Sequence, residues 1–184
     1  MDAEIRLETG FDEALYGLSL SHNVDVSEGL RKRMVPVAHK LAHKQGGHNK
    51  FLESIVAWVD VRAPRYWWQE ADTYRLSTKQ SESTMHTVTK RALRPSDFAE
   101  SLPVGWLDTL NDCVRVKNWY RLKQLLPESF MQRRLWLVSY KTLQNIFYQR
   151  GNHRLPEWRE FLEQVSCQLE YPEWVERPSR EESE

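Results

Sequence analysis

Residues 54–76 read SIVAWVDVRAPRYWWQEADTYRL, and two kinds of pattern meet within them. Ile, Val and Trp are dense over residues 54–62, where Asp60 alternates with its valine neighbours, and this pattern predicts a strand. Pro64 is favoured at a first helical position, so residues 65–76 are predicted to form a short helix. This junction indicates a fold that contains both strand and helix.

Amphipathic spacing predicts further helices on both sides of the junction. Ser27 is a plausible N-cap for one of them, Pro36 should kink it or open its first turn, and Gly46-Gly47 should end it. The predicted helices cover residues 11–20, 30–41, 104–125 and 129–149, and a last one begins near Pro156. Residues 77–89 are polar and rich in hydroxyls, which favours loop or edge structure.

These elements add up to an α+β fold that is mostly helical, with a small sheet near the middle of the chain. A length of 184 residues fits one domain, expected over residues 1–170. The charged residues 171–184 are expected to form a C-terminal tail that frays after Trp174.

Composition excludes several functional classes. Lysine plus arginine and aspartate plus glutamate both total 26, and a formal net charge of zero argues against broad binding to a nucleic-acid backbone. The sequence contains no run of about 18 apolar residues, and its acidic start lacks the apolar core of a secretory signal. Its two cysteines are too few for a disulfide framework. We therefore expect a soluble cytoplasmic protein with neither a membrane nor a nucleic-acid partner.

A metal site is a weak candidate. His39 and His43 share one helix face at a spacing of four residues, as metal ligands do. The glutamate that follows the first histidine in zinc proteases is absent, and no third ligand is evident. The sequence favours a solvated basic helix face, and we expect no metal.

A cluster of hydroxyls offers two interpretations. Hydroxyls, cations and free backbone amides are what a phosphate monoester requires, but a polar surface loop has the same composition. The cluster consists of Ser77, Thr78, Ser81, Ser83, Thr84 and Thr87, with Arg75, Lys79 and His86 among them. Arg150 lies just past the helix predicted over residues 129–149, where a cation offsets the macrodipole, and this accounts for it unless another segment converges on it. Cys113 and Cys167 have no neighbouring histidine and are better small core residues than nucleophiles.

Four segments, in this order, resemble the flavin-dependent thymidylate synthases, and the likeness covers about residues 27–165. The family pattern is a Gly-His and a Glu before a strand ending in Ala-Pro, then Arg-His-Arg and Glu-x-Ser-x-Arg-Tyr, then Leu-Pro with a following Trp, then Asn-x-Arg-Ser-Leu-x-Asn-Phe-x-x-x-Arg. The corresponding segments are GHNKFLESIVAWVDVRAP (47–64), TYRLSTKQSESTMH (73–86), LPESFMQRRLW (126–136) and SYKTLQNIFYQR (139–150).

The resemblance implies a small central antiparallel sheet and a homotetramer with active sites shared between subunits. It implies a flavoprotein that binds FAD and converts dUMP to dTMP, with methylenetetrahydrofolate as carbon donor and NADPH as reductant. A compact, divergent member of the family would suit a bacteriophage genome and act in the host cytoplasm.

Site residues follow from the resemblance position by position. Arg150 falls on the arginine that reaches the pyrimidine and would stabilise negative charge there as the catalytic residue. Ser81, Ser83 and Lys123 fall on nucleotide-binding positions, with Ser83 at the serine that binds the phosphate. The flavin-side positions are His48, Glu53, Arg75, Lys141 and Asn145.

The signature also departs from the family. Thr73-Tyr74 stand where the family has Arg-His, Ser81 stands at the signature Glu, and Met85-His86 stand at its Arg-Tyr. Lys141 and Lys123 replace arginines. Two alternatives therefore stay open: a flavoenzyme that hydroxymethylates dUMP or dCMP, and a catalytically degenerate homologue that binds a nucleotide or a protein without turnover.

Overall fold

A computed structural model describes residues 1–23, 25 and 29–178, and its centre is a four-stranded antiparallel sheet. The strands are β1 (Asp2–Thr9), β2 (Val56–Pro64), β3 (Ser77–Ser81) and β4 (Met131–Ser139), in the order β1-β2-β4-β3. Strands β1 and β3 are thus the edges. The α+β class and the small central sheet expected from the sequence are confirmed.

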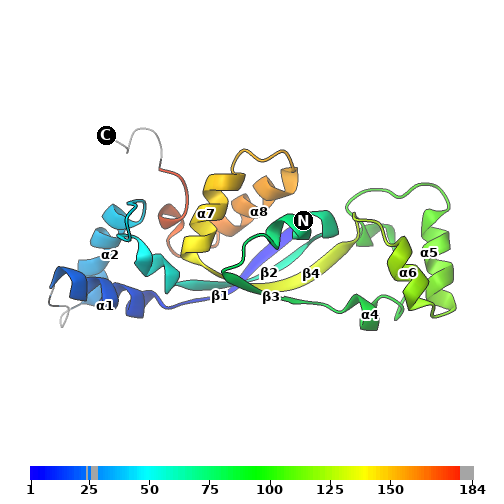
Figure 1. Cartoon of the computed structure of the whole chain (residues 1–184), viewed down its shortest axis with the longest axis horizontal. Helices are drawn as coiled ribbons and strands as arrows, with labels where there is room; N and C mark the ends of the chain where they lie inside the picture. Colours follow the sequence, from blue (N-terminus) through cyan, green and yellow to red (C-terminus); the bar gives the residue numbers. More distant parts are fainter. Residues whose placement is uncertain (24, 26–28, 179–184) are drawn as a thin grey trace.

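Helices lie at both ends of the sheet and over one of its faces (Figure 1). Helices α1 and α2 form one end of an elongated molecule, α5 and α6 form the other, and α7 and α8 lie over the sheet. Their bounds are α1 (Phe11–His22), α2 (Leu30–Leu41), α3 (Arg65–Ala71), α4 (Thr84–Thr87), α5 (Trp106–Arg115), α6 (Trp119–Leu125), α7 (Tyr140–Arg150) and α8 (Pro156–Ser166). Short 3₁₀ helices cover Lys50–Glu53, Pro95–Asp97 and Pro172–Trp174.

Aromatic side chains fill the core between the sheet and the helices. The ring of Trp67 in α3 lies 4.9 Å from that of Trp68 and 4.6 Å from that of Trp158 in α8, centroid to centroid. Trp136 of β4 stacks on Phe161 of α8 at 5.7 Å. All five side chains are buried, and this large apolar area fixes α3 and α8 to the sheet.

Several predicted elements are confirmed, with shifts at their ends. The strand predicted over residues 54–62 is β2, the helices near residues 11–20 and Pro156 are α1 and α8, and the polar stretch after residue 77 begins with the edge strand β3. Pro36 lies inside α2 rather than in its first turn. That helix ends at Leu41, before Gly46-Gly47, which instead turn the following loop with positive φ angles. Ser27, the expected N-cap, lies outside the described residues.

The single helix predicted over residues 129–149 is wrong in its first half. Residues 131–139 form β4, in which Trp136 and Val138 are buried and their neighbours Leu135 and Leu137 are only partly buried. This alternation has the period of a strand, whereas the helical spacing begins only at Tyr140. The Ser139 hydroxyl accepts a hydrogen bond from the Thr142 N–H and begins α7.

The single helix predicted over residues 104–125 is two helices. Lys117 has a φ of +54°, a left-handed conformation that no helix continues through. The Asn118 side chain then accepts from the Arg121 N–H at 3.0 Å and caps α6. The apolar positions before and after the break still lie together, because α5 and α6 pack on each other.

Strand β1 was not predicted. It pairs with β2 antiparallel, with a shift in register between Ile5 and Leu7. Gly10 connects β1 to α1 at a φ of +92°, and a Cβ there would lie 2.2 Å from the Ser54 carbonyl oxygen. Only glycine fits this turn, which brings α1 against the segment before β2.

The C-terminal segment packs on the core as far as Val175. Trp174 and Val175 are fully buried, and the Tyr171 and Trp174 rings stack at 4.1 Å. The division into a domain and a tail at residue 170 stays a prediction, and residues 179–184 lie outside the described part. Among the residues that are described, none of the helices has both the length and the apolar character needed to cross a bilayer.

Candidate functional site

Glu53 lies between two pockets. The smaller pocket, of about 390 Å³, lies where β3 and β4 meet α7, and Glu53, Lys141 and Asn145 line it. The larger pocket, of about 560 Å³, lies between α1, the end of α2 and the 3₁₀ helix, and His48 and Glu53 line it. Four of the five residues expected on the flavin side therefore gather around two pockets that share one carboxylate.

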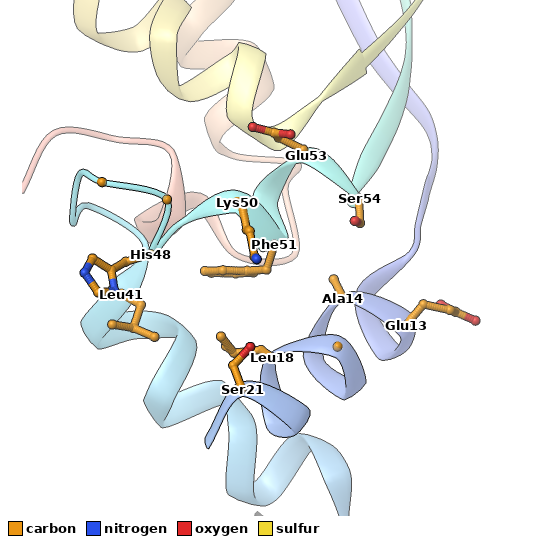
Figure 2. A pocket seen from close by; sticks show the side chains of 13 residues that line it. Glu13, Ala14, Leu18, Ser21, Leu41, His48, Lys50, Phe51, Glu53 and Ser54 are labelled. Carbon is orange, nitrogen blue, oxygen red and sulfur yellow. The ribbon is translucent and has the colours of Figure 1, made fainter. Parts of the chain in front are cut away.

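Figure 2 shows how the larger pocket is built. His48 lies beside Leu41 at one side, Glu53 and Ser54 lie at the opposite rim, and the Phe51 ring lies between them. Phe51 is buried, whereas His48 and Glu53 are exposed. An apolar floor with polar groups at the rim is the usual construction of a ligand site.

Two buried amides hold this region together, and the sequence reasoning missed both. The Asn49 side chain donates to the Ala42 carbonyl at 3.0 Å and to the Gln144 side-chain oxygen at 3.2 Å. Gln144 donates to the carbonyls of Ala42 and Trp174, both at 2.8 Å. These bonds tie the loop that carries His48 to α7. The only signal in the sequence is a glutamine within the apolar stripe of a predicted helix.

The smaller pocket combines an apolar wall with polar groups. Leu76 and Leu137 supply apolar surface, and Lys141 and Asn145 supply an amine and an amide. The Lys141 amine donates to the Gln144 side-chain oxygen at 3.1 Å, so it is fixed by the same buried network. The Thr142 hydroxyl donates to the Leu76 carbonyl at 3.3 Å and holds the start of β3 against α7. This combination suits an aromatic ring system with polar edges.

Arg150 lies in a separate cluster built from three segments. Its Nη1 is 2.8 Å from Glu70 Oε2, and its Nε donates to the Tyr74 hydroxyl at 3.0 Å. Its guanidinium carbon lies 4.9 Å from the centroid of the Trp158 ring, and the Trp158 indole N–H donates to Glu70 Oε2 at 2.8 Å. His153 Nε2 lies 3.4 Å from the same oxygen. Because α3 and α8 converge on Arg150, a role in offsetting the helix dipole does not account for it.

Glu70 and Trp158 are site residues that the sequence reasoning missed. Trp158 falls within the helix predicted to begin near Pro156, and Glu70 lies within a predicted short helix among aromatic residues. Neither position has a local signal, because what singles them out is the contact with Arg150.

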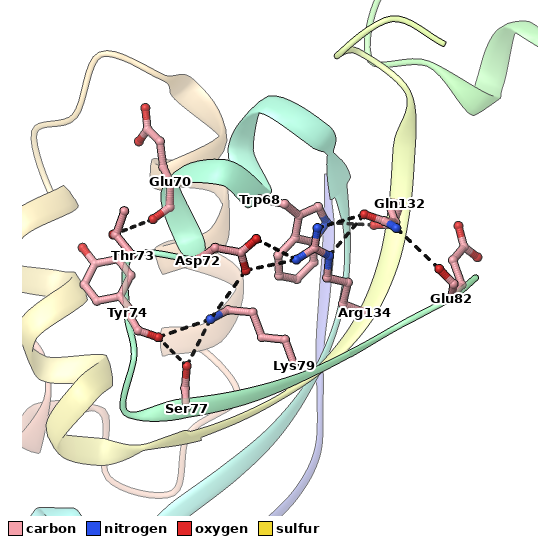
Figure 3. A network of polar contacts seen from close by, with 10 residues as sticks. All are labelled: Trp68, Glu70, Asp72, Thr73, Tyr74, Ser77, Lys79, Glu82, Gln132 and Arg134. Carbon is pink, nitrogen blue, oxygen red and sulfur yellow. Dashed lines mark hydrogen bonds and ion pairs between the residues drawn. The ribbon is translucent and has the colours of Figure 1, made fainter. Parts of the chain in front are cut away.

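A network of charges lies beside the edge strand β3, on the side of the sheet that faces the helices (Figure 3). Arg134 Nη1 is 3.0 Å from both Asp72 carboxylate oxygens, and Lys79 Nζ lies 3.9 Å from one of them. The two cations also lie over the rings of Trp68 and Trp136, at 4.5 and 4.7 Å. Burial lowers the pKa of Lys79, while Asp72 opposes that shift. Lys79 is therefore bound within the fold and is not a free cation of the hydroxyl loop.

The residues expected at the phosphate lie elsewhere. Ser83 is the residue before α4, Ser81 ends β3 opposite Arg134, and Lys123 is exposed on α6. Helix α4 packs on α6, toward the end of the molecule away from α1 and α2 (Figure 1). The length of β3, roughly 13 Å at 3.3 Å per residue, separates Ser81 from the end of the strand nearer Arg150. A single chain therefore does not bring Ser83 and Arg150 together.

The remaining candidates are Arg75, His39 and His43. Arg75 is exposed in the turn between α3 and β3. His39 accepts from the Trp174 indole N–H at 3.0 Å, and His43 is hydrogen-bonded to the Tyr148 hydroxyl and the Glu173 carbonyl, each at 2.7 Å. Within the described ranges, three or more His, Cys, Asp or Glu side chains nowhere come close enough to hold a metal ion.

Comparison with known proteins establishes the fold. No family model and no curated protein matches the sequence. Among solved structures, a flavin dependent thymidylate synthase ThyX from Helicobacter pylori, complexed with FAD and dUMP, matches with a TM-score of 0.83 at 16% identity, covering 96% of this chain and 98% of that one. A second structure of ThyX from the same organism with FAD and dUMP matches with a TM-score of 0.78 at 17% identity, over 94% and 95% of the two chains. This chain thus has the ThyX fold over nearly its whole length.

Proposed function

We propose that this protein is a flavin-dependent enzyme that methylates C5 of a pyrimidine deoxynucleoside monophosphate, or modifies it in a related way. The family resemblance makes dUMP the default substrate and dTMP the product, with methylenetetrahydrofolate as carbon donor and NADPH as reductant. One observation carries the proposal: Glu53, Lys141 and Asn145, assigned to the flavin from two distant segments, line a single pocket. The shared fold with FAD- and dUMP-bound ThyX structures supports it.

We place FAD across the two pockets that share Glu53. FAD is a dinucleotide with two linked halves, and the pockets lie on either side of Glu53. Lys141 and Asn145 would hold one half, and His48 would contact the other. When bound, FAD would supply the reducing equivalents that it receives from NADPH.

Arg150 is suited to hold the pyrimidine. Its guanidinium is fixed by Glu70, Tyr74 and Trp158 before any ligand arrives, so little reorganisation would accompany binding. Preorganised donors of this kind stabilise negative charge as it develops on a ring oxygen.

A complete nucleotide site requires more than one subunit in this proposal. The far end of β3, away from Arg150, carries Ser81, and Ser83 and Lys123 follow beyond it. The Ser83 that holds the phosphate and the Arg150 that holds the base of one nucleotide would therefore come from different chains. A homotetramer with shared sites satisfies this requirement. Tryptophans that are not fully buried support such contacts: Trp106 and Trp119 are exposed and Trp58 is half-buried, whereas the other five are fully buried. We place the reaction in the cytoplasm, of the host if the chain is phage-encoded.

A nucleotide-binding homologue without turnover is the second candidate. Two observations favour it: Arg150 is paired with Glu70, and both Lys79 and Arg134 are paired with Asp72. Lys79 and Arg134, two cations close to the altered signature, are thus already engaged.

Product analysis separates the candidates. The full-length protein is incubated with FAD, NADPH, methylenetetrahydrofolate and either dUMP or dCMP, and the nucleotides are analysed by mass spectrometry. If the protein is the proposed enzyme, we expect a yellow protein and a nucleotide that gains a methyl or hydroxymethyl group. FAD uptake and nucleotide binding without a new product would support the second candidate. A protein that takes up neither ligand would refute both.

A further inference from the structure

Glu70 lies next to the arginine assigned to the pyrimidine. Its Oε2 is 2.8 Å from Arg150 Nη1, and a third of its side chain is accessible to solvent. The α3 backbone and the Trp158 indole, which donates to the same oxygen at 2.8 Å, hold the carboxylate in place. Any planar ring that approaches Arg150 from solvent therefore meets this carboxylate too.

In the described part of the chain, Glu70 has one carboxylate oxygen that is free to accept a hydrogen bond from a ligand. An ionised carboxylate only accepts hydrogen bonds, and the contacts of Glu70 within the described ranges run to Oε2. Oε1 is thus left for a ligand that donates. Arg150 offers the opposite chemistry, because a guanidinium only donates and its Nη2 has no partner among the described residues.

The edge of cytosine satisfies such a pair at every position. Cytosine presents a donor at its 4-amino group and acceptors at N3 and O2, so Glu70 would accept from the amino group while Arg150 donates to N3 and O2. Uracil presents acceptors at O4 and O2 with a donor at N3 between them. If Glu70 accepts from N3 and Arg150 donates to one ring oxygen, the other ring oxygen faces the carboxylate, and two acceptors repel each other.

We infer that Glu70 reads the base and makes the site selective for a cytosine nucleotide, such as dCMP, over a uracil nucleotide. This inference rests on the proposed function, since it takes from it the placement of the pyrimidine at Arg150, and it changes the default substrate within the same class. A base-edge contact of this kind discriminates by about 1–3 kcal/mol, or roughly tenfold or more in affinity.

Nucleotide binding tests the inference without depending on turnover. The dissociation constants of dCMP and dUMP are measured by isothermal titration calorimetry on the full-length protein with FAD, for the wild type, Glu70→Gln, Glu70→Asp and Glu163→Gln. Glu163→Gln is the matched control, because it makes the same substitution at an exposed position of α8. Circular dichroism confirms that each variant is folded.

The expected result is that the wild type binds dCMP at least tenfold more tightly than dUMP. Glu70→Gln narrows or reverses this preference, because an amide can also donate to O4. Glu70→Asp keeps the preference for dCMP at lower affinity, and Glu163→Gln changes nothing. Equal or tighter binding of dUMP by the wild type, or an unchanged preference in Glu70→Gln, would overturn the inference and leave the proposed function intact. Binding of neither nucleotide would remove both.

Discussion

Asn49 and Gln144 are hydrogen-bonded to each other at 3.2 Å and to the same Ala42 carbonyl, although 95 residues separate them in the sequence. Both side chains are buried, so no water replaces a lost partner. This pair fixes the loop that carries His48 and Glu53 relative to the helix that carries Lys141 and Asn145. The geometry of both pockets therefore depends on two residues that line neither.

We predict that Gln144→Ala destabilises the protein and weakens flavin binding. The change removes the side-chain donor to the buried Trp174 carbonyl and one of the two partners of both the Asn49 amide and the Ala42 carbonyl, which should cost about 2–4 kcal/mol in the free energy of unfolding. Thermal denaturation and FAD titration measure the two effects. Gln124→Ala, the same change at an exposed position of α6, should leave both nearly unchanged. Wild-type flavin affinity in Gln144→Ala would show that the network does not position the pockets.

Arg150→Ala should abolish turnover and weaken nucleotide binding. Loss of one preorganised donor typically lowers kcat by 10²–10³, which corresponds to about 3–4 kcal/mol. Here the change also leaves the Glu70 carboxylate without its arginine partner. Steady-state kinetics with either nucleotide measure the effect. Arg159→Ala, an exposed arginine on α8, is the control. Unchanged kinetics in Arg150→Ala would refute the assigned role.

Ser83→Ala should act on the nucleotide and not on the fold. The Ser83 hydroxyl donates to no protein group among the described residues, whereas its carbonyl accepts from the Thr87 hydroxyl at 2.7 Å and is kept in the variant. We expect the nucleotide KM to rise roughly three- to tenfold, which corresponds to about 1 kcal/mol, with an unchanged melting temperature. Ser101→Ala serves as the control. Equal affinity in Ser83→Ala would place the phosphate elsewhere.

Asp97→Asn should reduce stability at neutral pH and much less in acid. Arg91 donates to both carboxylate oxygens, at 2.6 and 2.7 Å, and holds the pKa of Asp97 below its usual value. A carboxylate with a lowered pKa in the folded state stabilises the protein above its unfolded pKa, and that stability is lost as the pH falls through the folded pKa. Near pH 7 we expect a loss of about 2 kcal/mol, and below about pH 3 the two proteins should converge.

Denaturant titrations across this pH range test the prediction. Asp112→Asn removes an exposed ion pair with Arg115 and should cost less than about 1 kcal/mol at any pH. A constant difference between wild type and Asp97→Asn from neutral to acidic pH would mean that the Asp97 charge does not contribute.

The sequence predicts the fold well where one period dominates. Residues 54–62 alternate and are dense in β-branched residues, and β2 is the result. Residues 131–150 contain two periods in succession, and Trp136 happens to precede Tyr140 by four residues, so the helical spacing of α7 extends falsely into β4. Only the pairing of Trp136 with Val59 and Lys79 in neighbouring strands resolves that ambiguity.

The candidate site is predictable to a different extent on each side. Glu53, Lys141 and Asn145 were assigned through a family pattern, which encodes tertiary proximity that periodicity does not. The sequence does not single out Glu70 as a site residue, because its importance lies in a contact with Arg150, 80 residues later in the chain. Single polar residues within apolar patterns mark such positions but do not reveal their partners.

Among the described residues, the buried apolar side chains form two separate clusters. One lies between the sheet and α7–α8, and the other joins α5 and α6 around Leu110, Leu122 and Phe130. Because the two clusters have no buried residue in common, we expect the α5–α6 end to open while the sheet stays intact. Its amide protons should exchange with deuterium before those of β2 and β4, which gives the molecule two steps of opening rather than one.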